Sequence, residues 1–492
     1  MKTKSLKLNF IMNAVLKMSA FIFPLITFPY VSRVLGADGN GKISFASSLV
    51  NYFTMFASLG VPTYGIRVCA QCRDDKEKLN KTVQELIFIN TITTIMAYLC
   101  LLVLVFNVHK LQEKSTIILI NSVSIALSVF GIEWLYQSLE EYSYITVRNL
   151  AFKVISVILM FLLVKNTDDY IVYAGINVIG TVGSNILNLL RLRKYVSLKK
   201  FDNYDIKHHI KPVLTFFALS VATTIYTSLD QVMLGFMASD AEVGYYAAAI
   251  KMKTILVSLV TSLGTVLLPR TSYYVQNGHI KEFKNIIQKA ICFVWAIALP
   301  LTIFFMLQAK RTILILGGEQ YLPATASMVV ITPTVLLIGL SNLTGVKVLV
   351  PLQFEKYTVY STCLGSVVDI IVNALLIPKC GAMGASIGTL FAEVVVLLFQ
   401  IFSINVLGYK EMLKVKWKEV AKCVWAVILS GVAVTLLNNT VLPDQAFISF
   451  IVSAFMFFGL YGVIMAIEKS ELFLLYAKPQ FRKLRDRIKG SV

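Results

Sequence analysis

The sequence predicts an all-α polytopic membrane protein with about fourteen transmembrane helices. Of its 492 residues, 57% are hydrophobic and only 15% are charged, whereas soluble domains carry about 25% charged residues. The apolar residues also gather in runs of the length that a membrane-spanning helix needs, about 20 residues. Because a helix satisfies its own backbone hydrogen bonds, runs of this length are expected to be helical in lipid.

The expected spans follow one another with short connections. They cover residues 8–32, 43–65, 83–106, 115–138, 145–164, 170–190, 213–237, 244–268, 286–307, 325–349, 357–377, 382–404, 419–437 and 446–467. From them we expect five parts: an N-terminal six-helix bundle over 1–195, a basic cytoplasmic linker over 196–212, a second six-helix bundle over 213–405, two peripheral transmembrane helices over 406–467, and a basic cytoplasmic tail over 468–492.

The chain has 46 lysine and arginine residues against 27 acidic ones, which gives it a formal net charge of +19. Most of these 46 residues lie in the two tails and in every second gap between the spans. The remaining gaps hold eight: Arg33, Lys42, Lys110, Lys114, Lys165, Lys310, Arg311 and Lys379. Positively charged loops stay in the cytoplasm, so both termini are predicted to be cytoplasmic. This explains the charge without nucleic acid, for which no recognition motif is present.

A short pattern occurs twice in the chain, which suggests an internal repeat. Leu35–Gly36, Gly41 and Ser58–Gly60 are followed about 200 residues later by Leu234–Gly235, Gly244 and Ser262–Gly264. Six helices in each repeat would leave both halves in the same orientation, related by a pseudo-two-fold axis along the membrane normal with a cavity between them. That layout is typical of an alternating-access transporter. Chance similarity between apolar helices is the alternative explanation.

Four stretches resemble the Wzx-type polysaccharide flippases, whose superfamily also contains multidrug exporters and lipid II flippases. They are FPLITFPYVSRVLGADGNGKISFA at 23–46, EWLYQSLEEYSYITVRN at 133–149, LDQVMLGFMASDAEVGYYAAAIKM at 229–252 and LLIPKCGAMGASIGTLFAE at 375–393. The resemblance implies a transporter that carries undecaprenyl-diphosphate-linked oligosaccharide across the bacterial plasma membrane for O-antigen or exopolysaccharide synthesis. Membrane lipids, a polysaccharide polymerase and glycosyltransferases are the further partners it implies.

Other functions stay open at this point. A lipid II flippase or a multidrug/cation antiporter would share the fold. A membrane glycosyltransferase or polysaccharide polymerase is more distant, because no gap between spans is long enough to form a catalytic domain. We therefore expect no enzyme and no bound cofactor or metal, with H+ or Na+ as the candidate coupling ions. The four histidines lie in predicted loops without metal-binding spacing and are expected to be solvated.

Charged residues inside the spans are the candidate site, because a charge at mid-bilayer costs about 2.5–3.5 kcal/mol unless it faces a cavity or a partner. The candidate substrate-binding cations are Lys17, Lys153, Lys251, Lys253 and Arg270. Lysine supplies phosphate with a point charge, although an intramembrane ion pair would also explain Lys17 and Lys153. Lys251 and Lys253 lie roughly 200° apart around a helix, so at most one faces the cavity, and we slightly favour Lys251. Snorkelling to water explains four residues near helix ends equally well: Arg148, Arg270, Glu133 and Lys347.

Three acidic residues within the spans are further candidates: Asp230, Asp369 and Glu393. Buried carboxylates can bind protons near neutral pH, so these residues are candidates either for ion coupling or for salt bridges with the lysines. Pro24 and Pro29 remove backbone hydrogen bonds from the first helix. They are hinge candidates, with a static kink as the alternative.

Overall fold

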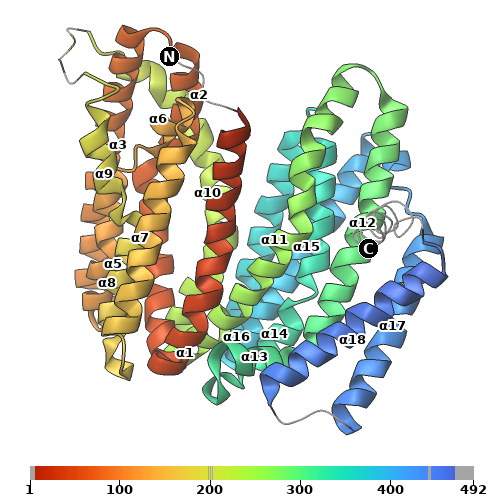
Figure 1. The fold of residues 1–492 in the computed structure, drawn as a ribbon. Coiled ribbons are helices and arrows are strands. Elements are labelled where there is room, and N and C mark those ends of the chain that lie inside the picture. Colours follow the sequence, from red (N-terminus) through yellow and green to blue (C-terminus); the bar gives the residue numbers. More distant parts are fainter. Residues whose placement is uncertain (1–5, 198, 200, 202, 441–444, 471–492) are drawn as a thin grey trace, which may run out of the picture. The chain divides into compact units, whose positions relative to one another are not determined.

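The structure, a computed structural model, describes residues 6–197, 199, 201, 203–440 and 445–470. The predicted basic tail lies outside these residues from position 471 onward. Every regular element within the described part is a helix, as Figure 1 shows. The chain divides into two compact units, Met1–Ala247 and Ala248–Val492. This division falls inside a helix, so the predicted six-helix bundles and their linker stay predictions.

The first unit contains these elements: α1 (Leu6–Ser58), α2 (Val61–Cys72), α3 (Lys76–Asn107), α4 (His109–Gln112), α5 (Ser115–Ser128), α6 (Glu133–Ser138), α7 (Tyr142–Leu163), η1 (Thr167–Asp169), α8 (Tyr170–Val178), the π-helix η2 (Ile179–Gly183), α9 (Asn185–Leu192) and α10 (Ile206–Met237). Helix α11 (Asp240–Gln276) begins in this unit and continues into the second.

The second unit continues with α12 (Ile280–Leu307), α13 (Ala309–Gly317), η3 (Glu319–Tyr321), α14 (Ala324–Ile331), α15 (Thr334–Asn342), the π-helix η4 (Leu343–Leu349), α16 (Glu355–Val406), η5 (Lys410–Leu413), α17 (Trp417–Thr440) and α18 (Ala446–Ile467). Here α17 packs against both α12 and α18. Among the described residues, ten helical segments are long and apolar enough to cross a membrane. The all-helical, multi-pass fold class is therefore confirmed, and the count of fourteen stays a prediction.

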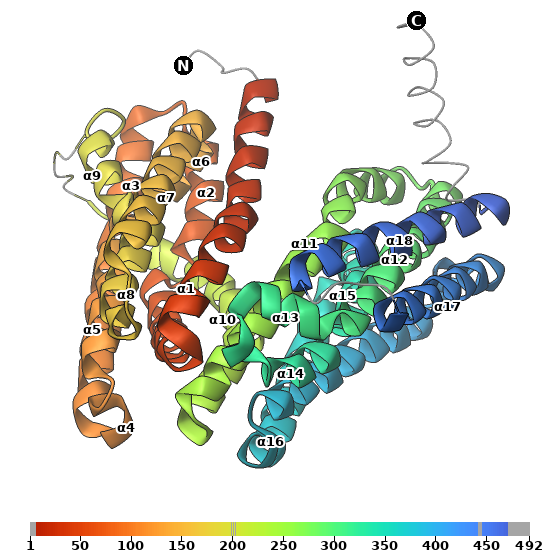
Figure 2. The same cartoon turned by 60° about the horizontal axis from the view of Figure 1, so that its bottom comes forward.

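A single glycine divides α1 into two arms. Gly36 has φ 70° while the rest of the helix keeps helical dihedrals, and only glycine adopts such a φ without steric cost. Asn40 Nδ2 donates a hydrogen bond to Ser32 Oγ at 3.1 Å, although residues eight apart in a straight helix lie about 12 Å apart. The chain therefore bends sharply between the predicted spans 8–32 and 43–65, and Figures 1 and 2 show the two arms meeting at this bend.

A second glycine divides α16 in the same way. Gly381 has φ 50°. A Cβ added to Gly388 would lie only 2.1 Å from Asn373 Oδ1, fifteen residues earlier, so the two arms lie back to back. The break falls between the predicted spans 357–377 and 382–404. In both helices, one residue with left-handed φ takes the place of the short loop that the sequence predicts.

A buried polar contact attaches the start of α10 to α2 and α3. His209 Nε2 lies 2.9 Å from Glu85 Oε2, and His209 Nδ1 lies 2.8 Å from the Tyr64 hydroxyl. The second oxygen of Glu85 accepts a hydrogen bond from the Asp205 backbone N–H at 2.6 Å. The expectation that all histidines are solvated is therefore wrong for His209, which is 4% exposed. The hydrogen bonds compensate the burial of these polar groups.

A second buried network surrounds Arg148 on α7. Its Nη2 lies 2.7 Å from Glu133 Oε2, and its Nη1 donates to the side-chain oxygen of Asn188. The guanidinium group also lies 5.6 Å from the centre of the Tyr144 ring, which Arg191 approaches to 4.1 Å. Arg148 is 3% exposed, so an ion pair accounts for its charge and snorkelling does not.

Candidate functional site

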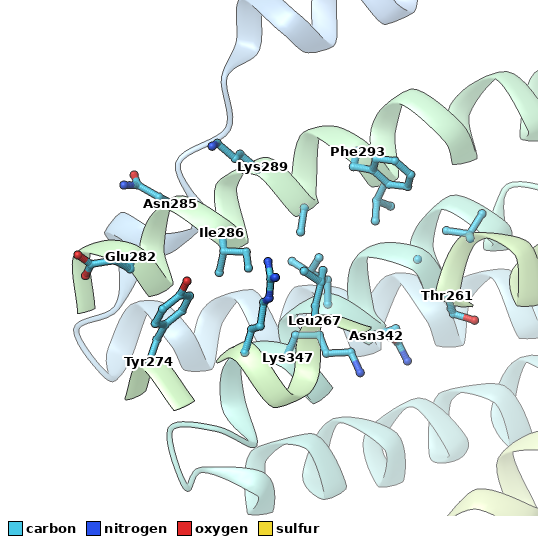
Figure 3. A pocket seen from close by; sticks show the side chains of 16 residues that line it. Thr261, Leu267, Tyr274, Glu282, Asn285, Ile286, Lys289, Phe293, Asn342 and Lys347 are labelled. Atoms are coloured by element: carbon cyan, nitrogen blue, oxygen red, sulfur yellow. The ribbon is translucent and has the colours of Figure 1, made fainter. Parts of the chain in front are cut away.

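A pocket of about 410 Å³ opens among α11, α12, α15 and η4 of the second unit. This volume lies within the range of about 300–1,000 Å³ that is usual for small-ligand sites. Gly339 brings α15 close to its neighbours, because an added Cβ would lie 2.7 Å from a Val260 methyl and 2.9 Å from a Val294 methyl. Figure 3 shows the lining side chains, with Lys289 on one side and Lys347 and Asn342 on the other.

Three cationic side chains line this pocket: Arg270 from α11, Lys289 from α12 and Lys347 from η4. One acidic residue also lines it, Glu282, whose carboxylate lies 4.0 Å from His279. Among the described residues, no carboxylate forms an ion pair with any of the three cations. The pocket therefore carries positive charge that a bound anion could neutralise, with Tyr274, Asn285 and Asn342 as further polar groups.

Lys347 is the buried member of the group, with 5% of its surface exposed. It lies in the π-helix η4, a kind of local widening that is frequent at functional sites. Side chains of α16 support this stretch. Thr358 Oγ1 donates to the Gly345 carbonyl at 3.4 Å, and Thr344 Oγ1 donates to Gln400 Oε1 at 2.5 Å. A buried lysine inside an apolar segment is a functional-site candidate by default.

These side chains suit an anionic ligand with several oxygen atoms. Arg270 can donate two parallel hydrogen bonds to a phosphate, whereas a lysine acts as a point charge. Arg270 and Lys289 are exposed and Lys347 is buried, so the positive charge extends from the edge of the pocket into its interior. A diphosphate group bound in the pocket could contact a cation both at its edge and in its interior.

The predicted cations of the first unit lie on α1 and α7. Lys17 is exposed on the first arm of α1, and among the described residues no carboxylate forms an ion pair with it. Lys153 Nζ donates to Ser19 Oγ at 2.9 Å and lies 5.8 Å from the centre of the Phe23 ring. Lys153 is therefore held against α1 by a neutral hydroxyl and an aromatic ring, without an acidic partner in the described part of the chain.

The remaining candidates are distributed over α10, α11 and α16. Lys251 and Lys253 are both half-buried on α11, and which of them faces a cavity stays a prediction. Asp230 is buried on α10 and accepts a hydrogen bond from the Tyr246 hydroxyl. Asp369 is buried on α16 and accepts one from Asn373 Nδ2 at 3.2 Å.

Glu393 is buried on the second arm of α16. Pro24 and Pro29 lie inside α1 without a break in its helical dihedrals, since the interruption falls at Gly36. Ion coupling by the acidic residues and hinge motion at the prolines stay predictions.

The grouping of Lys289 and Lys347 with Arg270 does not follow from the sequence. Lys347 is predicted near a helix end, where a lysine can reach water, and Lys289 stands at the start of a predicted span. The only signal in the sequence is that both are charged residues within apolar segments. Their common pocket depends on the packing of η4 against α11 and α12, which lie more than thirty residues earlier in the chain.

Comparisons with known proteins agree with a transport function. Residues 6–275, more than half of the chain, match the model of a family described as "Polysaccharide biosynthesis protein". A protein of Shigella dysenteriae described as "Putative O-antigen transporter" is 25% identical over 406 residues, which cover 81% of this chain and 100% of that protein. A protein of Escherichia coli K12 with the same description is 22% identical over 354 residues, which cover 72% of this chain and 85% of that protein.

A solved structure shares the fold. It is described as "Lipid II flippase MurJ, inward closed conformation" and superposes with a TM-score of 0.76 at 16% identity, covering 94% of this chain and 100% of that one. At this identity the likeness speaks for the fold alone. The family match and the two relatives confirm the resemblance to the polysaccharide flippases.

Proposed function

The chain belongs to the polysaccharide biosynthesis protein family, and from this membership we propose that it is a flippase for undecaprenyl-diphosphate-linked oligosaccharide repeat units. It moves them from the cytoplasmic to the outer face of the bacterial plasma membrane, for cell-surface polysaccharide synthesis. Both termini lie in the cytoplasm, about fourteen helices cross the membrane, and transport proceeds by alternating access. The relatives described as O-antigen transporters support this choice of substrate class.

The pocket formed by Arg270, Lys289 and Lys347 is the observation that carries the proposal. A diphosphate leaves its hydration shell when it enters the membrane interior, and a charge without water or a partner is very unfavourable there. Fixed cations that have no carboxylate partner of their own can replace that water. A multidrug exporter for cationic compounds would be expected to present acidic groups in such a pocket instead.

Lys17 and Lys153 would serve the same purpose in the first unit. Both lie in apolar helices, and neither has a carboxylate partner among the described residues. Lys153 is already held in place by Ser19, which lowers the conformational entropy that it loses when it binds phosphate. We assign Lys17 the larger role, because its amine is not engaged by Ser19 or by any described carboxylate.

The proposal is tested with purified protein in liposomes that contain an undecaprenyl-diphosphate-linked disaccharide ending in galactose. Galactose oxidase cannot cross the membrane, so without transport it oxidises only the sugar of the outer leaflet. Flippase activity should expose the whole pool. The same disaccharide on a polyprenyl monophosphate is the matched control, and it should move more slowly because it offers the cations less charge.

Other results would identify other functions. Transport of a cationic dye together with an immobile glycolipid would indicate a multidrug exporter. Movement of lipid II at a higher rate than the oligosaccharide lipid would indicate a lipid II flippase. A covalently altered glycolipid would indicate an enzyme. Each of these outcomes would overturn the proposed function.

A further inference from the structure

The bend of α1 and the start of α11 touch through two glycines. A Cβ added to Gly41 would lie 1.7 Å from the Asp240 carbonyl oxygen, and one added to Gly244 would lie 2.1 Å from the Ala37 carbonyl oxygen. No real side chain tolerates either distance, and the opposing atom is backbone in both cases. Both glycines have helical backbone, which alanine would adopt readily. The facing chain is therefore what requires glycine at these positions.

The contact is reciprocal with respect to the internal repeat. Gly41 and Gly244 are the glycines that the repeat pairs, and they are 203 residues apart, as are Ala37 and Asp240. Asp240 is therefore the counterpart of Ala37 in the second repeat, as Gly244 is of Gly41. Gly41 contacts Asp240, and Gly244 contacts Ala37. In a two-fold interface, residue i meets residue j of the partner and j meets i. The contact has this pattern within one chain, so it lies on a local pseudo-two-fold axis.

Two lysines from the connection between α3 and α5 contact the turn between α10 and α11. Lys114 Nζ pairs with the Asp240 carboxylate and lies 4.8 Å from the centre of the Phe45 ring. Lys110 Nζ donates to the Phe236 carbonyl at 3.0 Å, at the C-terminal end of α10, where a helix attracts positive charge. The side chains of Lys114 and Asp240 are only 11% and 14% exposed, so solvent screens their attraction weakly.

These lysines are unusual for the side of the membrane on which they are predicted to lie. Lys110 and Lys114 are among the eight cations of the gaps assigned to the outside, a side that cationic residues generally avoid. Two of them converge on the turn between α10 and α11. Their interactions at this turn provide a reason for keeping positive charge there.

We propose that the Gly41–Gly244 contact, secured by Lys114 and Asp240, is the outer closure of the transport path. The two glycine segments are in contact in the conformation of this structure, and they separate when the transport path opens to the outside. Small residues let membrane helices approach through their backbones, so this contact forms and breaks without the repacking of side chains. The inference rests on the proposed function, since a closure has a role only in a protein that transports.

The test adds one methyl group at each glycine. Gly41→Ala and Gly244→Ala should leave the helices intact, because alanine favours a helix over glycine by about 1 kcal/mol. Gly175→Ala is the matched control, since its nearest neighbour would be an Ile120 methyl at 4.0 Å. A water-soluble carbodiimide, which joins an amine directly to a carboxylate, reports closure in nanodiscs through the amide between Lys114 and Asp240, identified by peptide mass spectrometry.

We expect the yield of this amide to fall about tenfold or more in Gly41→Ala and Gly244→Ala, because overpacking a tight contact shifts the population away from it. The control should retain the yield of the unmodified protein. Transport of the galactose-terminated lipid should be lost in the two variants and kept in the control. Cross-linking and transport at the unmodified level in both glycine variants would overturn the inference.

A charge exchange decides the question even if the alanine variants fail to reach the membrane. Lys114→Asp alone should lose both the amide and transport, and combining it with Asp240→Lys should restore both. Normal transport by Lys114→Asp would refute the closure. If the unmodified protein forms the amide but moves no glycolipid, the proposed function fails. If it transports and all these variants do too, only the closure fails.

Discussion

Replacing Lys347 by methionine should make the protein more stable and less active. The lysine is 5% exposed and lies two residues from the end of the apolar segment Ala324–Leu349. A central cation would cost about 2.5–3.5 kcal/mol, and the cost falls toward the membrane surface, so we assign Lys347 about 1–2 kcal/mol. The methionine side chain is about as long as that of lysine, and methionine favours a helix as lysine does. It therefore removes the cost of burying the charge with little change in packing.

The same change should weaken the binding of substrate. A hydrogen bond to a charged group contributes about 1.5–3 kcal/mol, which corresponds to about 10- to 100-fold in apparent affinity. We expect the lipid concentration for half-maximal transport to rise by that factor. The melting temperature in detergent should meanwhile rise by about 1–3 °C. Opposite signs for stability and transport distinguish a ligand-binding lysine from one that supports the fold.

Lys281→Met is the matched control, because Lys281 is exposed on α12 and lies outside the pocket. It should change neither quantity. Lys347→Arg keeps the charge on a larger planar group and should retain part of the transport. A Lys347→Met protein that melts lower than the unmodified protein and transports at its rate would refute the reasoning, because Lys347 would then stabilise the fold and bind nothing.

Three further changes probe other parts of the molecule. Lys17→Ala should abolish transport at normal protein level and Lys17→Arg should keep part of it; full activity of Lys17→Ala in the galactose oxidase assay would remove Lys17 from the site. Arg148→Met removes the cationic partner of Glu133, which keeps hydrogen bonds from Gln137 and Asn149, and should lower the stability by about 1–3 kcal/mol. An unchanged melting curve would contradict the ion pair. Glu85→Leu removes the carboxylate partner of His209 and the acceptor of the Asp205 backbone N–H. This change should lower the free energy of unfolding by about 1–3 kcal/mol. Trypsin should then cut the 191–211 segment faster, and an unchanged rate would show that this contact does not hold the segment.

Hydropathy along the chain determines much of the fold by itself. A run of about 20 apolar residues allows only a helix in lipid, so the positions of the long helices follow from local composition. The four stretches quoted from the sequence also indicate the family, which the match over residues 6–275 confirms. The repeat around Gly41 and Gly244 is also visible in the sequence, because a glycine required by a close approach cannot be replaced by another residue.

What the sequence leaves open is which side chains meet. The partners of His209, the contact of Arg148 with Asn188, and the grouping of Lys289 with Lys347 all join helices that are not neighbours along the chain. Hydropathy carries little information about these contacts, because lipid is as apolar as a leucine side chain and does not select the face that a helix turns inward. Each residue turns a helix by about 100°, so an uncertainty of one residue in its packing moves a lysine from a pocket to a neighbour or to lipid. Only the packed structure determines these rotations, and with them the site.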